Sequence, residues 1–160
     1  MKKLIVLSAI ATLSSGAALA SNLDVGGSVP SVCEVTTSGS SAHFAKLEMG
    51  EKYQLPITSL RCNDYDGATV TLTSSEGHMQ TVDGKDATGV GYTAQFKAGP
   101  YDFTLNATTG ADDIHASQSK NGSAALAAGY NSGNIFMTVT QTPTFAGNYT
   151  DQLMLTITAN

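Results

Sequence analysis

The chain is poor in the residues from which most metal centres are built. It contains no tryptophan, two cysteines and three histidines. His43, His78 and His115 are far apart in the sequence, and two cysteines alone cannot complete a zinc ligand set, so we expect no metal site. The absence of tryptophan excludes a core of the antibody type, in which a tryptophan packs against the disulfide.

Motifs for catalysis are also missing. The sequence has no Gly-x-Ser-x-Gly elbow, no paired-histidine metal motif and no phosphate-binding glycine loop. The acidic pairs Asp64/Asp66 and Asp112/Asp113 lack EF-hand spacing, and we interpret them as solvated loop residues. We therefore expect that the protein is not an enzyme and takes no cofactor. A secreted enzyme or inhibitor is an alternative that no motif favours.

Long apolar runs are confined to the N-terminus. Lys2 and Lys3 precede a short apolar run at 4–13, and Ala18-Leu19-Ala20 has the small-x-small form of a signal-peptide cleavage site. Residues 1–20 are therefore predicted to be a signal peptide, since the run is too short for a membrane anchor. The exported chain of about 140 residues has the size of a single domain.

The exported chain is acidic. Of the eight basic residues in the full sequence, Lys2 and Lys3 would leave with the signal peptide, so that six remain against 13 acidic residues. Because the chain also lacks a basic cluster, we expect no nucleic-acid partner.

Cys33 and Cys62 are the two cysteines. An even pair in an exported chain is typical of a disulfide. Closing a loop of about 30 residues should remove about 3.5 kcal/mol of unfolded-state entropy in the chain-entropy model.

Apolar and polar residues alternate through most of the chain, with the period of two that is typical of strands. A phase slip between Ile57 and Leu60 indicates a bulge or bend. Asp66-Gly67, Asp83-Gly84 and Gly99-Pro100 are turn signals. The predicted strands are 32–37, 42–49, 54–62, 68–74, 90–97, 101–107, 135–142 and 149–160, and 108–134 is predicted to be a long loop with one helical turn near 123–128.

Seven or so short strands without a convincing helix favour an all-β fold. We expect an antiparallel β-sandwich that is immunoglobulin-like in the broad sense.

One further stretch alternates, although it precedes the first cysteine. Leu23, Val25 and Val29 are separated by two or four positions, with polar residues or glycine between them. This is the pattern of a strand with one buried face. N-terminal segments usually fray unless another segment binds them, so the pattern raises the question of what this strand pairs with.

The two ends of the chain and its early cysteine pair together resemble a pilin of the chaperone–usher pathway. The stretch 146–160 (AGNYTDQLMLTITAN) is similar to the last strand of spore coat protein U-like (archaic) subunits and of alternate-class pilins. The stretch 25–29 (VGGSV) is similar to the donor strand of type 1 pilins. The resemblance covers both ends well and the middle only as a β-rich body.

The resemblance implies an incomplete immunoglobulin-like antiparallel β-sandwich, completed by a donor strand from a neighbouring subunit. Residues 21–31 would then be the donor extension and 32–160 the pilin domain. Leu23, Val25 and Val29 would fill pockets, and Gly27 would be the small residue at which donor and chaperone strands exchange. Pro30 would end the donor strand.

The resemblance places the groove wall and chaperone contact near the C-terminus, and two departures from the family pattern occur there. Type 1 pilins commonly have a penultimate aromatic residue, where this chain has Ala159. Asp151 falls on the expected inner face, which requires either a wet strand end or a bulge. The implied wall residues are Gly147, Tyr149, Leu153, Leu155 and Ile157.

The implied function is that of a structural subunit of a surface fimbria that supports adhesion or biofilm formation. Its partners would be identical subunits in a head-to-tail polymer, a periplasmic chaperone, an outer-membrane usher, and a host or abiotic surface. It would pass through the periplasm to the cell surface. Two alternatives stay open: a secreted or tip-located adhesin that uses loop 108–134, and a monomeric periplasmic protein whose leading strand completes its own sheet.

Overall fold

The computed structural model describes residues 22–82 and 89–160, and these residues form mainly antiparallel β-structure. The predicted signal peptide and the Asp83-Gly84 turn lie outside the described residues. A five-stranded sheet has the order β1-β2-β8-β5-β6, and a three-stranded sheet has the order β10-β3-β7. The strands of the first are β1 (Cys33–Thr37), β2 (Lys52–Cys62), β8 (Gly133–Val139), β5 (Tyr92–Ala98) and β6 (Tyr101–Ala107), and those of the second are β10 (Leu153–Ala159), β3 (Ala68–Ser74) and β7 (Ile114–Lys120).

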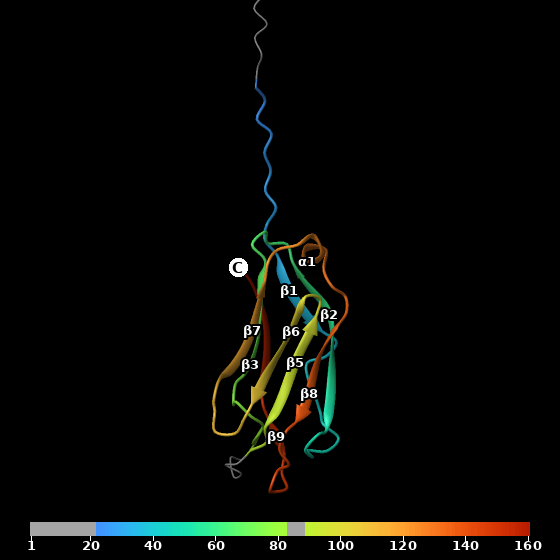
Figure 1. Cartoon of the computed structure of the whole chain (residues 1–160), viewed down its shortest axis with the longest axis vertical. Helices are drawn as coiled ribbons and strands as arrows, with labels where there is room; N and C mark the ends of the chain where they lie inside the picture. The colour runs from blue at the N-terminus through green and yellow to red at the C-terminus, as the bar shows by residue number, and fades with distance from the viewer. Residues whose placement is uncertain (1–21, 83–88) are drawn as a thin grey trace, which may run out of the picture.

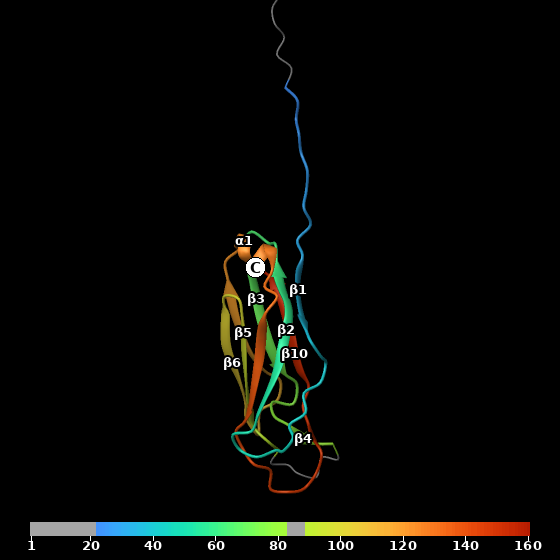
Figure 2. The ribbon, with the colours of Figure 1, turned by 90° about the vertical axis from the view of Figure 1, so that its right-hand side faces the viewer.

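The two sheets face each other along the length of an elongated domain (Figures 1 and 2). Two short strands, β4 (Gln80–Thr81) and β9 (Tyr149–Thr150), pair at one pole. The helix α1 (Ala124–Ala128) lies at the other pole, where Ser123 caps its N-terminus by accepting a hydrogen bond from the Leu126 amide. The N-terminal extension leaves the domain from the α1 pole.

Alternating burial builds one core between the sheets. Every second residue of β3 and of β5 is buried, because successive strand residues point to opposite faces. Phe96 and Tyr101 meet edge to face with ring centroids 6.5 Å apart. The Tyr101 hydroxyl donates to the Ala68 carbonyl at 2.9 Å, which joins the two sheets through the core.

Most strand predictions are confirmed. The stretches 68–74 and 101–107 form strands with the predicted bounds, and the disulfide joins Cys33 to Cys62. The predicted bulge is present, because the β1–β2 register skips Thr58 between the pairs Thr36–Ser59 and Thr37–Ile57. The predicted helical turn is α1.

Three strand predictions are wrong. The stretch 42–49 forms no strand, because Ala42, Phe44 and Leu47 pack against the core as a loop and pair with no other strand. The predicted loop 108–134 contains β7, whose inner positions after Ile114 are Ala116, Gln118 and Lys120 and therefore give little apolar alternation. The final run is split into β9 and β10, which pair with β4 and β3, respectively.

The two margins between the sheets differ. On one side the edge strands β6 and β7 approach each other, and the Gln118 side-chain oxygen accepts from the Asp102 amide at 2.9 Å. On the other side lie the edge strands β1 and β10, and within the described residues each of these four edge strands has a single ladder partner. This second margin is where the domain is hollowed.

Candidate functional site: a groove between two edge strands

A groove of about 820 Å³ lies between β1 and β10. Its floor reaches the core, since Leu55, Ile135 and Met137 of the five-stranded sheet contribute to its lining together with Met79 and Tyr92. More of the lining is apolar than polar, and both walls end in backbone edges that could accept another strand. A hollow with these two properties fits an extended peptide that has one apolar face.

The C-terminal wall is formed by β10 and the residues just before it. Leu153 and Leu155 line the groove, together with Tyr149 of β9. Ile157 lies on the same face of β10 and packs half-buried against the core, beyond the lined part of the groove. Gly147 lies in the loop before β9 and is not part of the lining. A Cβ added at Gly147 would lie within 4 Å of the Thr81 and Tyr149 side chains.

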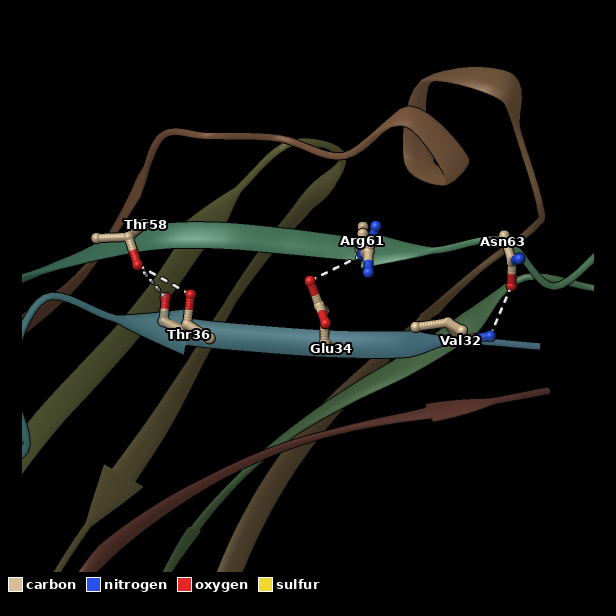
Figure 3. A network of polar contacts seen from close by, with 6 residues as sticks. All are labelled: Val32, Glu34, Thr36, Thr58, Arg61 and Asn63. Atoms are coloured by element: carbon tan, nitrogen blue, oxygen red, sulfur yellow. Dashed lines mark hydrogen bonds and ion pairs between the residues drawn. The ribbon is translucent and has the colours of Figure 1, made fainter. Parts of the chain in front are cut away.

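The opposite wall is β1, where Val35 and Thr37 line the groove. Polar pairs on the outward face attach this edge strand to β2 (Figure 3). Arg61 Nε lies 2.8 Å from Glu34 Oε1, and Thr36 shares a hydrogen bond of 2.9 Å with Thr58. The Cys33–Cys62 disulfide joins the same two strands. The wall is therefore attached on one side while its other edge stays open.

Asp151 lies where the alternation of the C-terminal run breaks. It lies between β9 and β10, so the chain changes partner at this residue rather than continuing one regular strand. Its carboxylate accepts from Ser74 Oγ at 2.5 Å, from the Tyr92 hydroxyl at 2.6 Å and from the Glu76 amide at 3.2 Å. Burial, followed by the hydrogen bond and charge of Asp151, raises the pKa of Tyr92 well above its usual value. The half-buried carboxylate thus anchors the start of the groove wall.

The N-terminal extension does not occupy this groove in the single chain. Residues 22–32 form no strand, and they project away from the domain (Figure 2). Leu23, Val25 and Val29 are 87%, 88% and 84% exposed. An added Cβ at Gly27 would meet nothing within 4 Å. The structure therefore keeps the extension apart from the groove residues of its own chain.

Of the five residues that the sequence placed on the C-terminal wall, Tyr149, Leu153 and Leu155 line the groove, whereas Gly147 and Ile157 do not; the rest of the groove was not predicted. Val35 shares its strand face with Cys33 and Thr37, and that alternation could have indicated the second wall. The floor residues could not be found in this way, because their alternation is the same as that of ordinary core residues. The lining that sequence reasoning missed includes Val35, Thr37, Ala42, Phe44, Leu55, Met79, Tyr92, Ile135 and Met137.

In residues 22–82 and 89–160, His, Cys, Asp and Glu side chains form no group of three or more that could hold a metal ion. None of the helices in that part of the chain has the length and apolar character needed to cross a membrane. A scan of family models, a search of curated proteins and a search of solved structures each found no match for this chain.

Proposed function

We propose that this protein is the structural subunit of a surface fimbria, and that it polymerises when the extension of one copy fills the groove of the next. The proposal rests on one observation: the same chain has both an unfilled groove and an exposed apolar segment that could fill such a groove. An apolar groove lies between two open strand edges, and an extended segment exposes three apolar side chains of one parity. The resemblance to chaperone–usher pilins supports the same assignment.

Insertion of the extension would satisfy both features. Backbone groups of the inserted strand would pair with the edges of β1 and β10, while Leu23, Val25 and Val29 would enter the groove. Transferring three aliphatic side chains from water contributes about 4.5–9 kcal/mol, at about 1.5–3 kcal/mol each. An open edge beside an apolar hollow is also an aggregation hazard. A periplasmic chaperone that occupies the groove before an outer-membrane usher assembles the fibre would remove that hazard.

Insertion between copies is favoured over insertion into the same chain. Asn63 Nδ2 donates to the Pro30 carbonyl at 3.0 Å, and the Val32 amide donates to Asn63 Oδ1 at 2.7 Å. These bonds fix the base of the extension where it points away from the domain (Figures 1 and 2). Self-insertion would require the chain to reverse at these bonded residues. Because a head-to-tail contact between copies does not close on itself, it generates a filament.

Deletion of residues 22–31 tests the proposal. The exported full chain should give SDS-resistant ladders and fibres by electron microscopy, whereas the truncated chain should give neither. A matched control keeps the extension and changes only its other face, with Asp24→Asn and Ser28→Thr, and should still polymerise. Polymerisation of the truncated chain to the same extent as the full chain would falsify the proposal.

A further inference from the structure

The loop after β2 carries a tyrosine whose side chain contacts almost nothing in its own chain. Tyr65 is 95% exposed and lies at the α1 pole, in the turn that joins β2 to β3. A large aromatic side chain on a surface loop is a common anchor of protein interfaces, because it buries much area with little loss of conformational entropy. Such a side chain loses less conformational entropy on binding when its loop is already held in place.

The backbone of this loop is held from several directions. The Asp66 amide donates to Asp64 Oδ1 at 3.0 Å, and Asn160 Nδ2 donates to the Asp66 carbonyl at 3.3 Å. Gly67 has a φ of 102°, and a Cβ there would lie 2.0 Å from the Lys120 carbonyl oxygen. A close approach of this kind leaves no room for the loop to shift towards β7. The ring of Tyr65 is therefore presented on a fixed backbone.

The same loop fixes the start of the extension. Asn63 bonds Pro30 and Val32, as described above, and Ser31 Oγ donates to Asp64 Oδ2 at 3.1 Å. Only residues 30–32 separate the last pocket-filling residue of the extension from β1. The four Cα–Cα steps from Val29 to Cys33 span at most about 14 Å. If the extension is seated in a neighbouring copy, the α1 pole must lie directly against that neighbour.

The position of the groove indicates which pole of the acceptor subunit contacts the donor subunit. Its lining uses the part of β10 nearest β9 and omits Ile157 to Ala159, so the hollow lies towards the pole opposite the extension. Entry from the α1 pole would place the incoming domain where the acceptor's own extension leaves, and the chain of subunits would stop there. Entry from the β9 pole leaves that exit free, so the donor's α1 pole faces the acceptor's β9 pole.

The β9 pole exposes apolar side chains on two connected loops. Met49 is 72% exposed and Phe145 is 61% exposed. The Met49 amide donates to Thr142 Oγ1 at 3.0 Å, and the Tyr149 hydroxyl donates to the Phe145 carbonyl at 2.8 Å, so both loops are attached to the domain. Methionine and aromatic side chains are suitable contacts for an incoming tyrosine ring.

We infer that Tyr65 packs against the Met49 and Phe145 loops of the next copy, and that this second contact sets the angle between subunits. The inference rests on the proposed function, since the inserted extension is what brings the two poles together. It adds a contact outside the groove, between residues that the extension does not touch. Loss of the contact should leave polymerisation intact and make the fibre more flexible.

Photocrosslinking in assembled fibres of the full chain tests the inference. With p-benzoylphenylalanine in place of Tyr65, irradiation should link chains, and mass spectrometry should map the adduct to residues 45–51 or 140–148 of another copy. The same photoreactive residue in place of Thr104, which is exposed in the middle of β6, should not reach those segments. Adducts from position 65 that map elsewhere, in fibres with an intact SDS-resistant ladder, overturn the inference alone.

A pair of variants separates the contact from a folding effect. Tyr65→Ser should keep the SDS-resistant ladder and shorten the persistence length of fibres in electron micrographs. Tyr65→Phe, which keeps the ring, should behave as the unchanged chain does. Equal stiffness of the serine and phenylalanine fibres contradicts the inference. If the unchanged chain gives no ladder at all, the proposed function itself is wrong.

Discussion

Alanine substitutions along the extension should weaken the subunit contact in proportion to the apolar surface removed, and only on one face. Val25 and Leu23 are 88% and 87% exposed in the single chain, so nearly all of their burial would come from insertion. Val25→Ala removes two carbons and Leu23→Ala three, at about 0.8 kcal/mol each, or about 1.6 and 2.4 kcal/mol. These free energies correspond to roughly 15-fold and 50-fold weaker contacts, since about 1.4 kcal/mol is tenfold.

The rate at which SDS-resistant dimers of the full chain separate at one fixed urea concentration measures this effect. Changes within one interface appear mainly in the dissociation rate, so Val25→Ala and Leu23→Ala should separate roughly 15 and 50 times faster. Asp24→Ala is the matched control, because Asp24 has the opposite parity and should face away from the groove. If Asp24→Ala speeds dissociation as much as Val25→Ala does, the extension does not insert with only one face towards the groove.

Three further predictions follow from the groove and its walls. Replacing both Cys33 and Cys62 by alanine should lower the free energy of unfolding by about 3.5 kcal/mol, measured by urea titration, because the unfolded chain gains loop entropy; an unchanged midpoint would contradict this. The raised pKa of Tyr92 means that the folded state retains a proton that the unfolded state loses above about pH 10, so stability should fall as the pH rises beyond that value. Tyr92→Phe should reduce this decline without abolishing it, since burial also raises the pKa of Tyr101. If urea titrations show that stability falls equally steeply with pH in the variant and the unchanged protein, Tyr92 does not contribute. Gly27→Leu should leave the fold of the subunit intact by circular dichroism, because nothing lies near Gly27, and should slow polymerisation followed by ladder formation; an unchanged rate argues against exchange at this residue.

The strands that were predicted well are those whose buried face is strongly apolar. In β3 and β6 the inner residues include valine, leucine, tyrosine and alanine, and the alternation of apolar and polar residues in the sequence is enough to locate both strands. The β7 strand escaped prediction because its inner positions include Ala116 and Gln118, which give no apolar signal. Its pairing depends on the neighbouring β3, which supplies the ladder for all seven of its residues.

The stretch 42–49 shows the opposite error. Ala42, Phe44 and Leu47 are partly buried against the core, yet they pack from a loop beside the groove that forms no ladder with any strand. Apolar spacing reports burial and not the hydrogen-bonding partner. The same limit explains Asp151, an acidic residue on the expected inner face of the final run. Its place there is explained by hydrogen bonds from Ser74 and Tyr92, which the sequence does not reveal.

The sequence by itself determined the all-β class, the disulfide and the alternating extension, because each depends on residue types at short spacing. Tertiary structure decided that β1 and β10 are edge strands on the same margin, since the strand order depends on ladders between residues as far as 91 positions apart, such as Ala68 and Ala159. It also decided that the extension leaves from one pole while the groove lies towards the other. The hydrogen bonds of Asn63 hold the base of the extension at that pole, and the sequence carries no local signal for these contacts.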